Sequence, residues 1–188
     1  MPRPRSDEKR SAILEAAVRV IVVEGLSAPT AGIAKEAGVA NGSLFTYFET
    51  KGELFNQLYL EIKSELASAT LKDRPAGLDE REEFFHVWRM WMDWAARNPD
   101  KRKALKQLGV SDEITAETRM AGHRIMAPVA ELMERARAQG PMRDASKGFV
   151  GALMNSVADA TMDFMTQDPV HAERYSSEGF DALWRMLH

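Results

Sequence analysis

The sequence contains no cysteine among its 188 residues. This absence excludes disulfide bonds, thiolate zinc sites, iron–sulfur clusters and cysteine nucleophiles. No apolar run approaches the roughly 20 residues that a membrane-spanning helix needs. The N-terminal stretch also lacks the apolar core of a secretory signal. We therefore expect a soluble, cytoplasmic protein with no membrane partner.

Sequence patterns for catalysis and metal binding are missing as well. None of the four histidines has the spacing of a His-Glu-x-x-His metal site; they are His86, His123, His171 and His188. There is no glycine-rich phosphate loop, and no serine stands in a nucleophile elbow. The sequence predicts no catalytic residue, no metal ligand and no cofactor, so we do not expect an enzyme.

The charge balance is slightly acidic. Lys and Arg number 25 against 28 Asp and Glu, a formal charge of −3, while 45% hydrophobic residues suffice for a core. A net negative charge argues mildly against a nucleic-acid partner. Residues 1–51, however, carry seven basic and six acidic residues, a net charge of +1, which leaves −4 for the remainder. The charge balance therefore argues only against a broadly basic protein that binds nucleic acid non-specifically.

Helical periodicity runs through the whole chain, and no segment alternates as a strand does. Apolar residues spaced three and four apart predict helices over 6–25, 30–37, 41–48, 51–71, 80–97, 99–109, 111–139 and 144–166. Gly122 and Pro128 are predicted kinks, and Ser176 or Ser177 is a predicted cap of the last helix. The sequence thus predicts an all-α fold of about nine helices. A three-helix N-terminal domain is joined by a long helix to a helical C-terminal domain.

Residues 30–48 form two short predicted helices joined by a three-residue turn. Such helices are too short to be stable alone, and the arrangement is typical of a helix-turn-helix. Ala34 and Ala37 allow close helix approach, Gly38 can end the first helix, and Leu44 and Phe48 face inward. The outward residues are small or hydrogen-bonding and uncharged, as a helix in a DNA major groove requires: Asn41, Gly42, Ser43, Thr46 and Tyr47. Spacing alone is equally compatible with a structural hairpin inside a helical bundle.

A longer motif favours DNA binding. Residues 33–54 read IAKEAGVANGSLFTYFETKGEL. This run resembles the signature of the TetR (tetracycline-repressor-like) family, Ile-Ala-x-x-Ala-Gly-Val-(small)-x-Gly-(Ser/Thr)-Leu-(Tyr/Phe)-x-(Tyr/His)-Phe-x-x-Lys-x-x-Leu. Nearly every fixed position matches. The resemblance is close over about the first 60 residues, and beyond them it extends only to length and helix order.

The resemblance implies a homodimer that binds a palindromic DNA operator, usually as a repressor, and is released by a small molecule in the C-terminal domain. It implies a DNA-binding domain over 1–52 and a ligand-binding and dimerisation domain over 53–188. By position, the DNA-binding residues are Thr30, Asn41, Gly42, Ser43, Phe45, Thr46, Tyr47 and Lys51. Thr30 and Lys51 are expected at phosphates. Phe45 lacks the hydroxyl of the family's usual Tyr, and the connection before Thr30 is one residue shorter than is common.

Basic residues also surround the start of the first helix, at Arg3, Arg5, Lys9 and Arg10. Such an arm can contact phosphates or reach into the minor groove. A solvated tail is an equally good interpretation.

The C-terminal part holds all four tryptophans and ten of the 11 methionines. Met and aromatic side chains adapt to varied apolar ligands. We therefore predict a ligand cavity lined by Trp88, Trp91, Met92, Met126 and Met154, with ordinary core packing as the alternative. The last two long predicted helices carry surplus apolar surface and small residues, and the resemblance places the homodimer interface there. An internal-core role for these helices is the alternative.

The sequence as a whole predicts a dimeric, ligand-responsive transcriptional regulator, most often a repressor in this family. The contrasting hypothesis is a helical interaction module or small enzyme in which the hairpin is structural.

Overall fold

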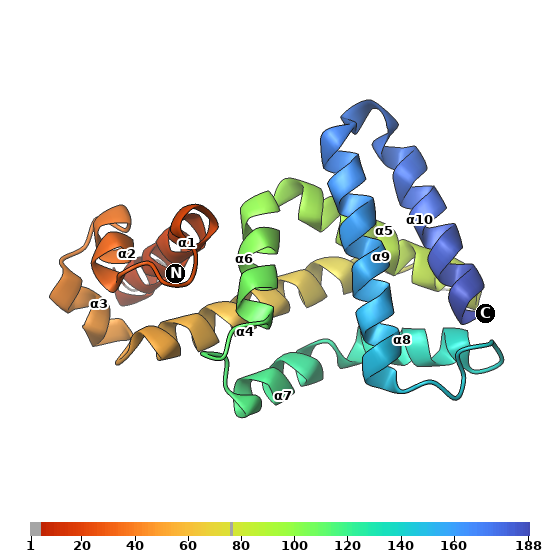
Figure 1. Ribbon diagram of the computed structural model, residues 1–188, viewed down its shortest axis with the longest axis horizontal. Helices are drawn as coiled ribbons and strands as arrows, with labels where there is room; N and C mark the ends of the chain where they lie inside the picture. The colour runs from red at the N-terminus through yellow and green to blue at the C-terminus, as the bar shows by residue number, and fades with distance from the viewer. Residues whose placement is uncertain (1–4, 76) are drawn as a thin grey trace. The chain divides into compact units, whose positions relative to one another are not determined.

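The computed structural model describes residues 5–75 and 77–188, and within them every regular element is a helix (Figure 1). The described residues form ten α-helices and one 3-10 helix. These are α1 Arg5–Glu24, α2 Thr30–Glu36, α3 Asn41–Tyr47, α4 Lys51–Leu71, α5 Glu80–Arg97, α6 Pro99–Gly109, α7 Ala116–Ile125, α8 Ala127–Arg137, α9 Lys147–Gln167, η1 Pro169–His171 and α10 Ala172–Leu187. The predicted all-α class is confirmed.

The additional helix comes from the stretch predicted as one helix over 111–139. That prediction was wrong, because the chain turns at 111–115 and breaks again at Met126, the N-cap of α8. Pro128 lies in the first turn of α8, where its missing N–H is tolerated. Gly122, the other predicted kink, lies inside α7 and does not interrupt the helix.

The predicted cap of the last helix was also wrong. The helix α10 begins at Ala172, directly after η1, and Ser176 is buried within it. Pro169 opens η1 and carries the chain into α10 without a further loop. The connection after α9 is therefore shorter than the predicted cap at Ser176 or Ser177 indicated.

The chain divides into two compact units. The first consists of residues up to Lys63 together with Pro99–His123, and the second of Ser64–Asn98 and Arg124–His188. The first unit extends beyond residue 52 because α6 packs on α1, where Gln107 Nε2 donates to the carbonyl of Ile21 at 3.3 Å. The predicted functional division at residues 52 and 53 stays a prediction.

The core of the first unit is built from α1 to α4. One face of α1 is buried along its length, and Gly25 ends the helix at φ +78°. Arg19 Nε joins α1 to α2 through a 2.6 Å bond to Glu36. The largest fully buried side chains of this unit are Phe48, Phe55, Ile13, Leu14, Ile21, Ile33, Leu44, Leu54 and Ile62.

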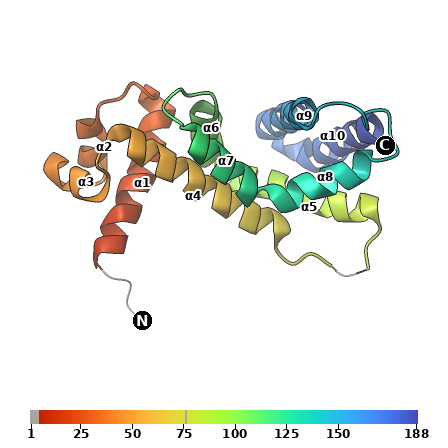
Figure 2. The same ribbon diagram turned by 90° about the horizontal axis from the view of Figure 1, so that it is seen from below.

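The core of the second unit surrounds α5. Asp79 caps α5 in a reciprocal capping box with Glu82, which fixes where the helix starts. Trp88 is buried and donates through Nε1 to the carbonyl of Ser176 at 2.9 Å. Helices α9 and α10 lie side by side as an antiparallel hairpin in both views (Figure 2).

No helix within the described ranges is both long enough and apolar enough to cross a membrane.

Candidate nucleic-acid interface

The helices α2 and α3 have seven residues each and are joined by a turn that is closed by its own backbone. Gly38 adopts φ +66°, a left-handed conformation that a side chain would strain. The amides of Gly38 and Val39 donate to the carbonyls of Lys35 and Ala34 at 3.1 and 3.0 Å. These bonds satisfy the last carbonyls of α2, so the end of α2 is a defined turn, as the sequence predicted.

The helix α3 has a buried side and an exposed side. Leu44 within α3 and Phe48 at its C-cap are fully buried, as predicted. On the other side Asn41, Gly42 and Thr46 are exposed, Ser43 and Tyr47 are half-buried, and the Phe45 side chain is 43% exposed. The structure therefore brings the six predicted α3 residues onto one short, uncharged helix with its outer side open to solvent.

The two predicted phosphate-contacting residues begin their helices. Thr30 is the first residue of α2 and is half-buried; the N-cap is Pro29. Lys51 is the first residue of α4, with its Nζ 5.3 Å from the centre of the Phe55 ring. The turn before Lys51 is ordered by side chains, because the Glu53 amide donates to Thr50 Oγ1 at 3.0 Å and the Glu49 amide to Glu53 Oε2 at 2.6 Å.

Arg10, one of the basic residues considered for a DNA-contacting arm, is held inside the first unit. Its guanidinium donates to Gln57 at 2.7 Å and to Glu61 at 3.1 Å, and it lies 5.7 Å from the centre of the Phe48 ring. Arg10 thus ties α1 to α4 beside the end of α3. Arg3 and the side chain of Arg5 lie outside the described residues, and Lys9 is exposed.

The predicted ligand-binding residues all lie in the second unit, and their joint role as a cavity lining stays a prediction. Trp88 and Met92 are fully buried on α5, and Trp91 packs edge-on to Trp88 with ring centres 6.2 Å apart. Met126 and Met154 are half-buried, at the start of α8 and on α9. The Trp88 ring also contacts Phe180 of α10, so it belongs to an aromatic core.

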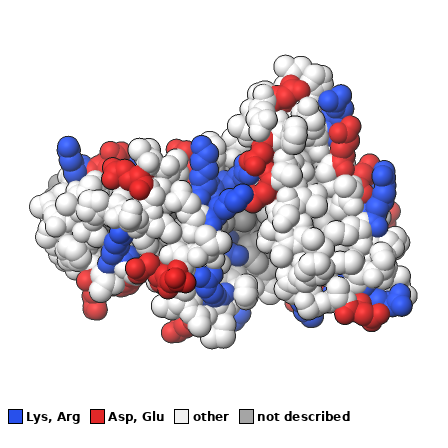
Figure 3. All heavy atoms as spheres, viewed as in Figure 1, with Lys and Arg blue, Asp and Glu red and all other residues white. Residues whose placement is uncertain are grey.

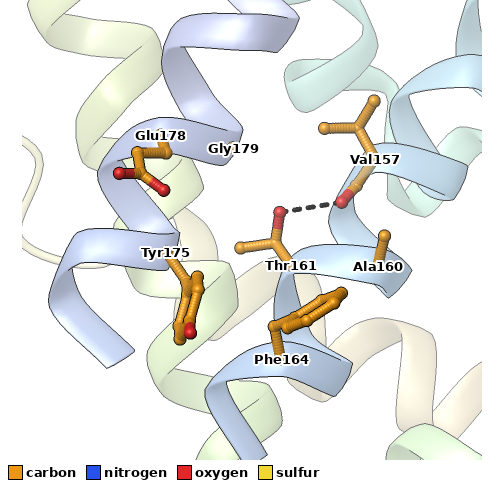
Figure 4. Close-up of a pocket in the computed structure, with 7 residues that line it drawn as sticks. All are labelled: Val157, Ala160, Thr161, Phe164, Tyr175, Glu178 and Gly179. Atoms are coloured by element: carbon orange, nitrogen blue, oxygen red, sulfur yellow. Dashed lines mark hydrogen bonds between the residues drawn. The ribbon is translucent and has the colours of Figure 1, made fainter. Parts of the chain in front are cut away.

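The second unit has a groove that the sequence analysis did not predict. It is shallow, encloses about 340 Å³ between α9 and α10, and is lined by Val157, Ala160, Thr161, Phe164, Tyr175, Glu178 and Gly179 (Figure 4). At one end the rings of Phe164 and Tyr175 lie 5.6 Å apart. A Cβ at Gly179 would clash with the Thr161 hydroxyl, so the glycine permits the close approach of the two helices. No local pattern indicates such a groove, because it arises from residues on two different helices.

The outer side of α9 is largely uncharged in the view of Figure 3. Its two phenylalanines, Phe149 and Phe164, are 55% and 54% exposed. A contiguous exposed apolar surface marks a site of interaction with other molecules, whereas single exposed rings are common on proteins.

A helix-turn-helix with a buried inner side, an exposed polar outer side and a following helical unit is typical of DNA-binding transcription regulators. Residues 13–58 match the model of the family described as "Bacterial regulatory proteins, tetR family". The resemblance seen in the sequence is therefore confirmed over these residues.

Solved structures share the whole fold. A tetR-family transcription regulator from Shewanella sp. PV-4, itself described as putative, is 28% identical, with a TM-score of 0.84 over 94% of this chain and 96% of that one. A TetR-family regulator from Marinobacter aquaeolei VT8 is 22% identical, with a TM-score of 0.82 over 96% and 97%. FadR from Bacillus subtilis, solved with stearoyl-CoA, is 18% identical, with a TM-score of 0.70 over 95% and 99%. All three are described as transcriptional regulators.

Proposed function

We propose that the protein is a homodimeric repressor that binds a palindromic operator through α3 and is released by a small molecule bound in its second unit. The observation that carries the proposal is the outer side of α3, which is exposed, uncharged and rich in short polar side chains. Such a surface can enter a major groove without repelling either the bases or the phosphates.

The side chains have distinct expected roles. Asn41 and Thr46 offer hydrogen bonds to base edges, and the exposed Phe45 ring offers an apolar contact to a thymine methyl group. Lys51, at the start of α4, supplies a charge for a phosphate. With a net charge of +1 over residues 1–51, affinity depends on where these few charges lie.

The exposed side of α9 supports a homodimer. Its exposed residues follow a stripe that is nearly symmetric about Ser156, with Ala152 and Ala160 four residues to either side and Phe149 and Phe164 beyond them. A two-fold contact requires a surface that complements itself, and an antiparallel crossing at Ser156 places small residues opposite small ones. Phe149 of one subunit then lies near Phe164 of the partner subunit, and Phe164 near Phe149 of the partner subunit.

Dimerisation also fits the expected operator. Each protomer presents one α3, so a two-fold dimer presents two recognition helices to two half-sites. In helix-turn-helix dimers these half-sites are about 34–36 Å apart, one helical turn of DNA or a multiple of it. The operator is therefore expected to be an inverted repeat.

We propose an apolar small molecule as the class of ligand. The aromatic and methionine-rich interior of the second unit, with Trp88, Trp91 and Met92, supports this class. The FadR structure with stearoyl-CoA gives a first compound to try. Because all four tryptophans lie in this unit, binding within it should change tryptophan fluorescence. A panel of acyl-CoAs, which carry an apolar chain, and of wholly apolar compounds that leaves both the fluorescence and DNA binding unchanged would contradict ligand control.

The operator claim is tested by a gel shift with the DNA that flanks the protein's own gene. We expect a complex that survives an excess of scrambled competitor DNA. Equal competition by specific and scrambled DNA would favour the contrasting hypothesis, in which the hairpin is structural.

A further inference from the structure

The connection between α6 and α7, residues 110–115, lies against the first turns of α4 within the first unit (Figure 1). One side chain of α4 makes the junction. Asn56 Nδ2 donates to the carbonyls of Gly52 and Glu113 at 2.6 and 2.7 Å, and Asn56 Oδ1 accepts from the amide of Thr115 at 3.0 Å. Both ends of the amide are used, so no other common side chain of this size reproduces the pattern.

Neighbouring residues also hold the α6–α7 connection in place. Ile114 is buried at its centre. At Gly52 a Cβ would lie 3.0 Å from a carboxylate oxygen of Glu113, so the connection approaches the α4 backbone closely there. From the other side, Arg119 of α7 donates to the carbonyls of Gly109 and Ser111 at 2.6 and 2.7 Å. The connection is therefore fixed both to α4 and to α7.

The junction lies next to the DNA-facing end of α4. Asn56 follows Lys51 by five residues, and the carbonyl that it holds within α4 belongs to Gly52, the residue adjacent to Lys51. We propose that Asn56 is a positioning residue for DNA binding, which fixes the first turns of α4, and with them Lys51, against the α6–α7 connection. The proposal rests on the proposed DNA-binding function.

A positioning role differs from a purely structural one in its dependence on Lys51. If Asn56 only stabilised the fold, its loss and the loss of Lys51 would reduce operator affinity independently. If Asn56 orients Lys51, the lysine contributes less once Asn56 is gone. Residues that act through one another give non-additive effects in a double-mutant cycle.

The test is such a cycle on operator affinity, with the full chain and the DNA fragment that flanks its gene. We expect Asn56→Ala to raise Kd about tenfold, the scale of one lost charge-assisted contact between Lys51 and a phosphate. Lys51→Ala should raise Kd clearly in the wild-type background and less than about twofold in the Asn56→Ala background. Ser68→Ala, at an exposed position on the same helix, is the control and should leave Kd unchanged.

Two further measurements keep the result clear. Asn56→Leu is nearly isosteric but loses both donations and the acceptor for Thr115, so it should repeat the loss without adding a charge near the DNA. Arg119→Ala frees the same connection from the α7 side and should also be non-additive with Lys51→Ala. Circular dichroism at the assay temperature verifies that each variant is folded.

Additive losses, or an unchanged Kd in folded Asn56→Leu, would overturn the positioning role. The slope of log affinity against log salt should fall by about 0.9 in Asn56→Leu, as it should in Lys51→Ala, because the phosphate contact of Lys51 is lost in both. An unchanged slope in Asn56→Leu would also overturn the role. A wild-type protein that does not prefer its own flanking DNA would overturn the proposed function and this role with it. The two failures are therefore distinguishable.

Discussion

The residues that begin α4 and line the outer side of α3 divide the expected work of DNA recognition into two kinds. Lys51 carries a charge at a helix start, whereas Thr46 is a short polar side chain on an exposed surface. Phosphate contacts are independent of sequence and sensitive to salt, while base contacts carry specificity. Substituting the two residues should therefore change DNA binding in different ways.

Lys51→Ala should weaken binding to all DNA sequences about equally and lower the slope of log affinity against log salt by about 0.9. Thr46→Ala should leave the slope unchanged and relax the preference at one base position, by about 1–3 kcal/mol if it makes a good base contact. Anisotropy titrations on an operator and its single-base variants, over several salt concentrations, separate the two. A common change in slope for both variants would contradict the assignment.

Lys63 is a half-buried lysine. It lies on α4 with its ammonium 5.4 Å from the centre of the Tyr59 ring, and burial lowers the pKa of Lys63 from its ordinary value of 10.5. Since the folded-state pKa is the lower one, the unfolded chain binds more protons between the two values. The free energy of unfolding therefore rises with pH in that alkaline window, and at neutral pH the charged form opposes folding.

Replacing this lysine should reveal that penalty. Lys63→Met is expected to raise the free energy of unfolding at pH 7 and to flatten its increase toward pH 10, as measured by urea denaturation. Lys103→Met, at an exposed position on α6, is the control and should change neither. A destabilised Lys63→Met protein at pH 7 would show that contacts of the ammonium outweigh its burial.

At the scale of elements, the α9–α10 hairpin depends on one close approach. A side chain at Gly179 would meet the Thr161 hydroxyl, whereas at Gly148, in the first turn of α9, nothing lies within reach of an added Cβ. The two glycines thus give a matched pair in neighbouring helices.

Gly179→Ala should destabilise the protein by about 1–3 kcal/mol because the helices must separate. Gly148→Ala should be neutral or stabilise it by up to about 1 kcal/mol, since alanine restricts the unfolded chain. Thermal or urea unfolding measures both. Adding Thr161→Ala should recover part of the loss at Gly179, and a lack of recovery would place the strain elsewhere.

Most element boundaries could be predicted from local residues. The helices α1 to α6 are bounded by residues such as Gly25, Gly38 and Asn98-Pro99, whose conformational preferences are visible in the sequence. The inner and outer sides of α3 could be predicted for the same reason, because the pattern repeats within seven residues.

What could not be predicted depends on contacts between distant residues. The turns at 111–115 are held by Asn56, which precedes Thr115 by 59 residues. The connection after α8 is held by a more local residue: Arg137 is buried and bonded to the carbonyls of Met142 and Ala145 and to Glu134, three to eight residues away. Neither Asn56 nor Arg137 forms a sequence motif. The α9–α10 groove escaped prediction for the same reason, since its residues come from two helices.

For the whole molecule, the proposed dimer makes a direct prediction. Ala160 lies on the exposed stripe of α9, and in a two-fold contact any substitution there occurs twice. Ala160→Lys should therefore convert the dimer to monomers and weaken operator binding. Ala130→Lys, at an exposed position of α8, should do neither. Sedimentation or light scattering gives the mass, and a dimeric Ala160→Lys protein would remove α9 from the interface.

The central claim, that the exposed side of α3 reads a specific DNA sequence, is tested most directly by comparing two affinities of the unmodified protein. The measurement is the Kd for the fragment that flanks its gene and for a scrambled fragment of equal length, each over a series of salt concentrations. We expect both affinities to fall as salt rises and the native fragment to stay at least about a thousandfold preferred. Equal affinities at every salt concentration would contradict it.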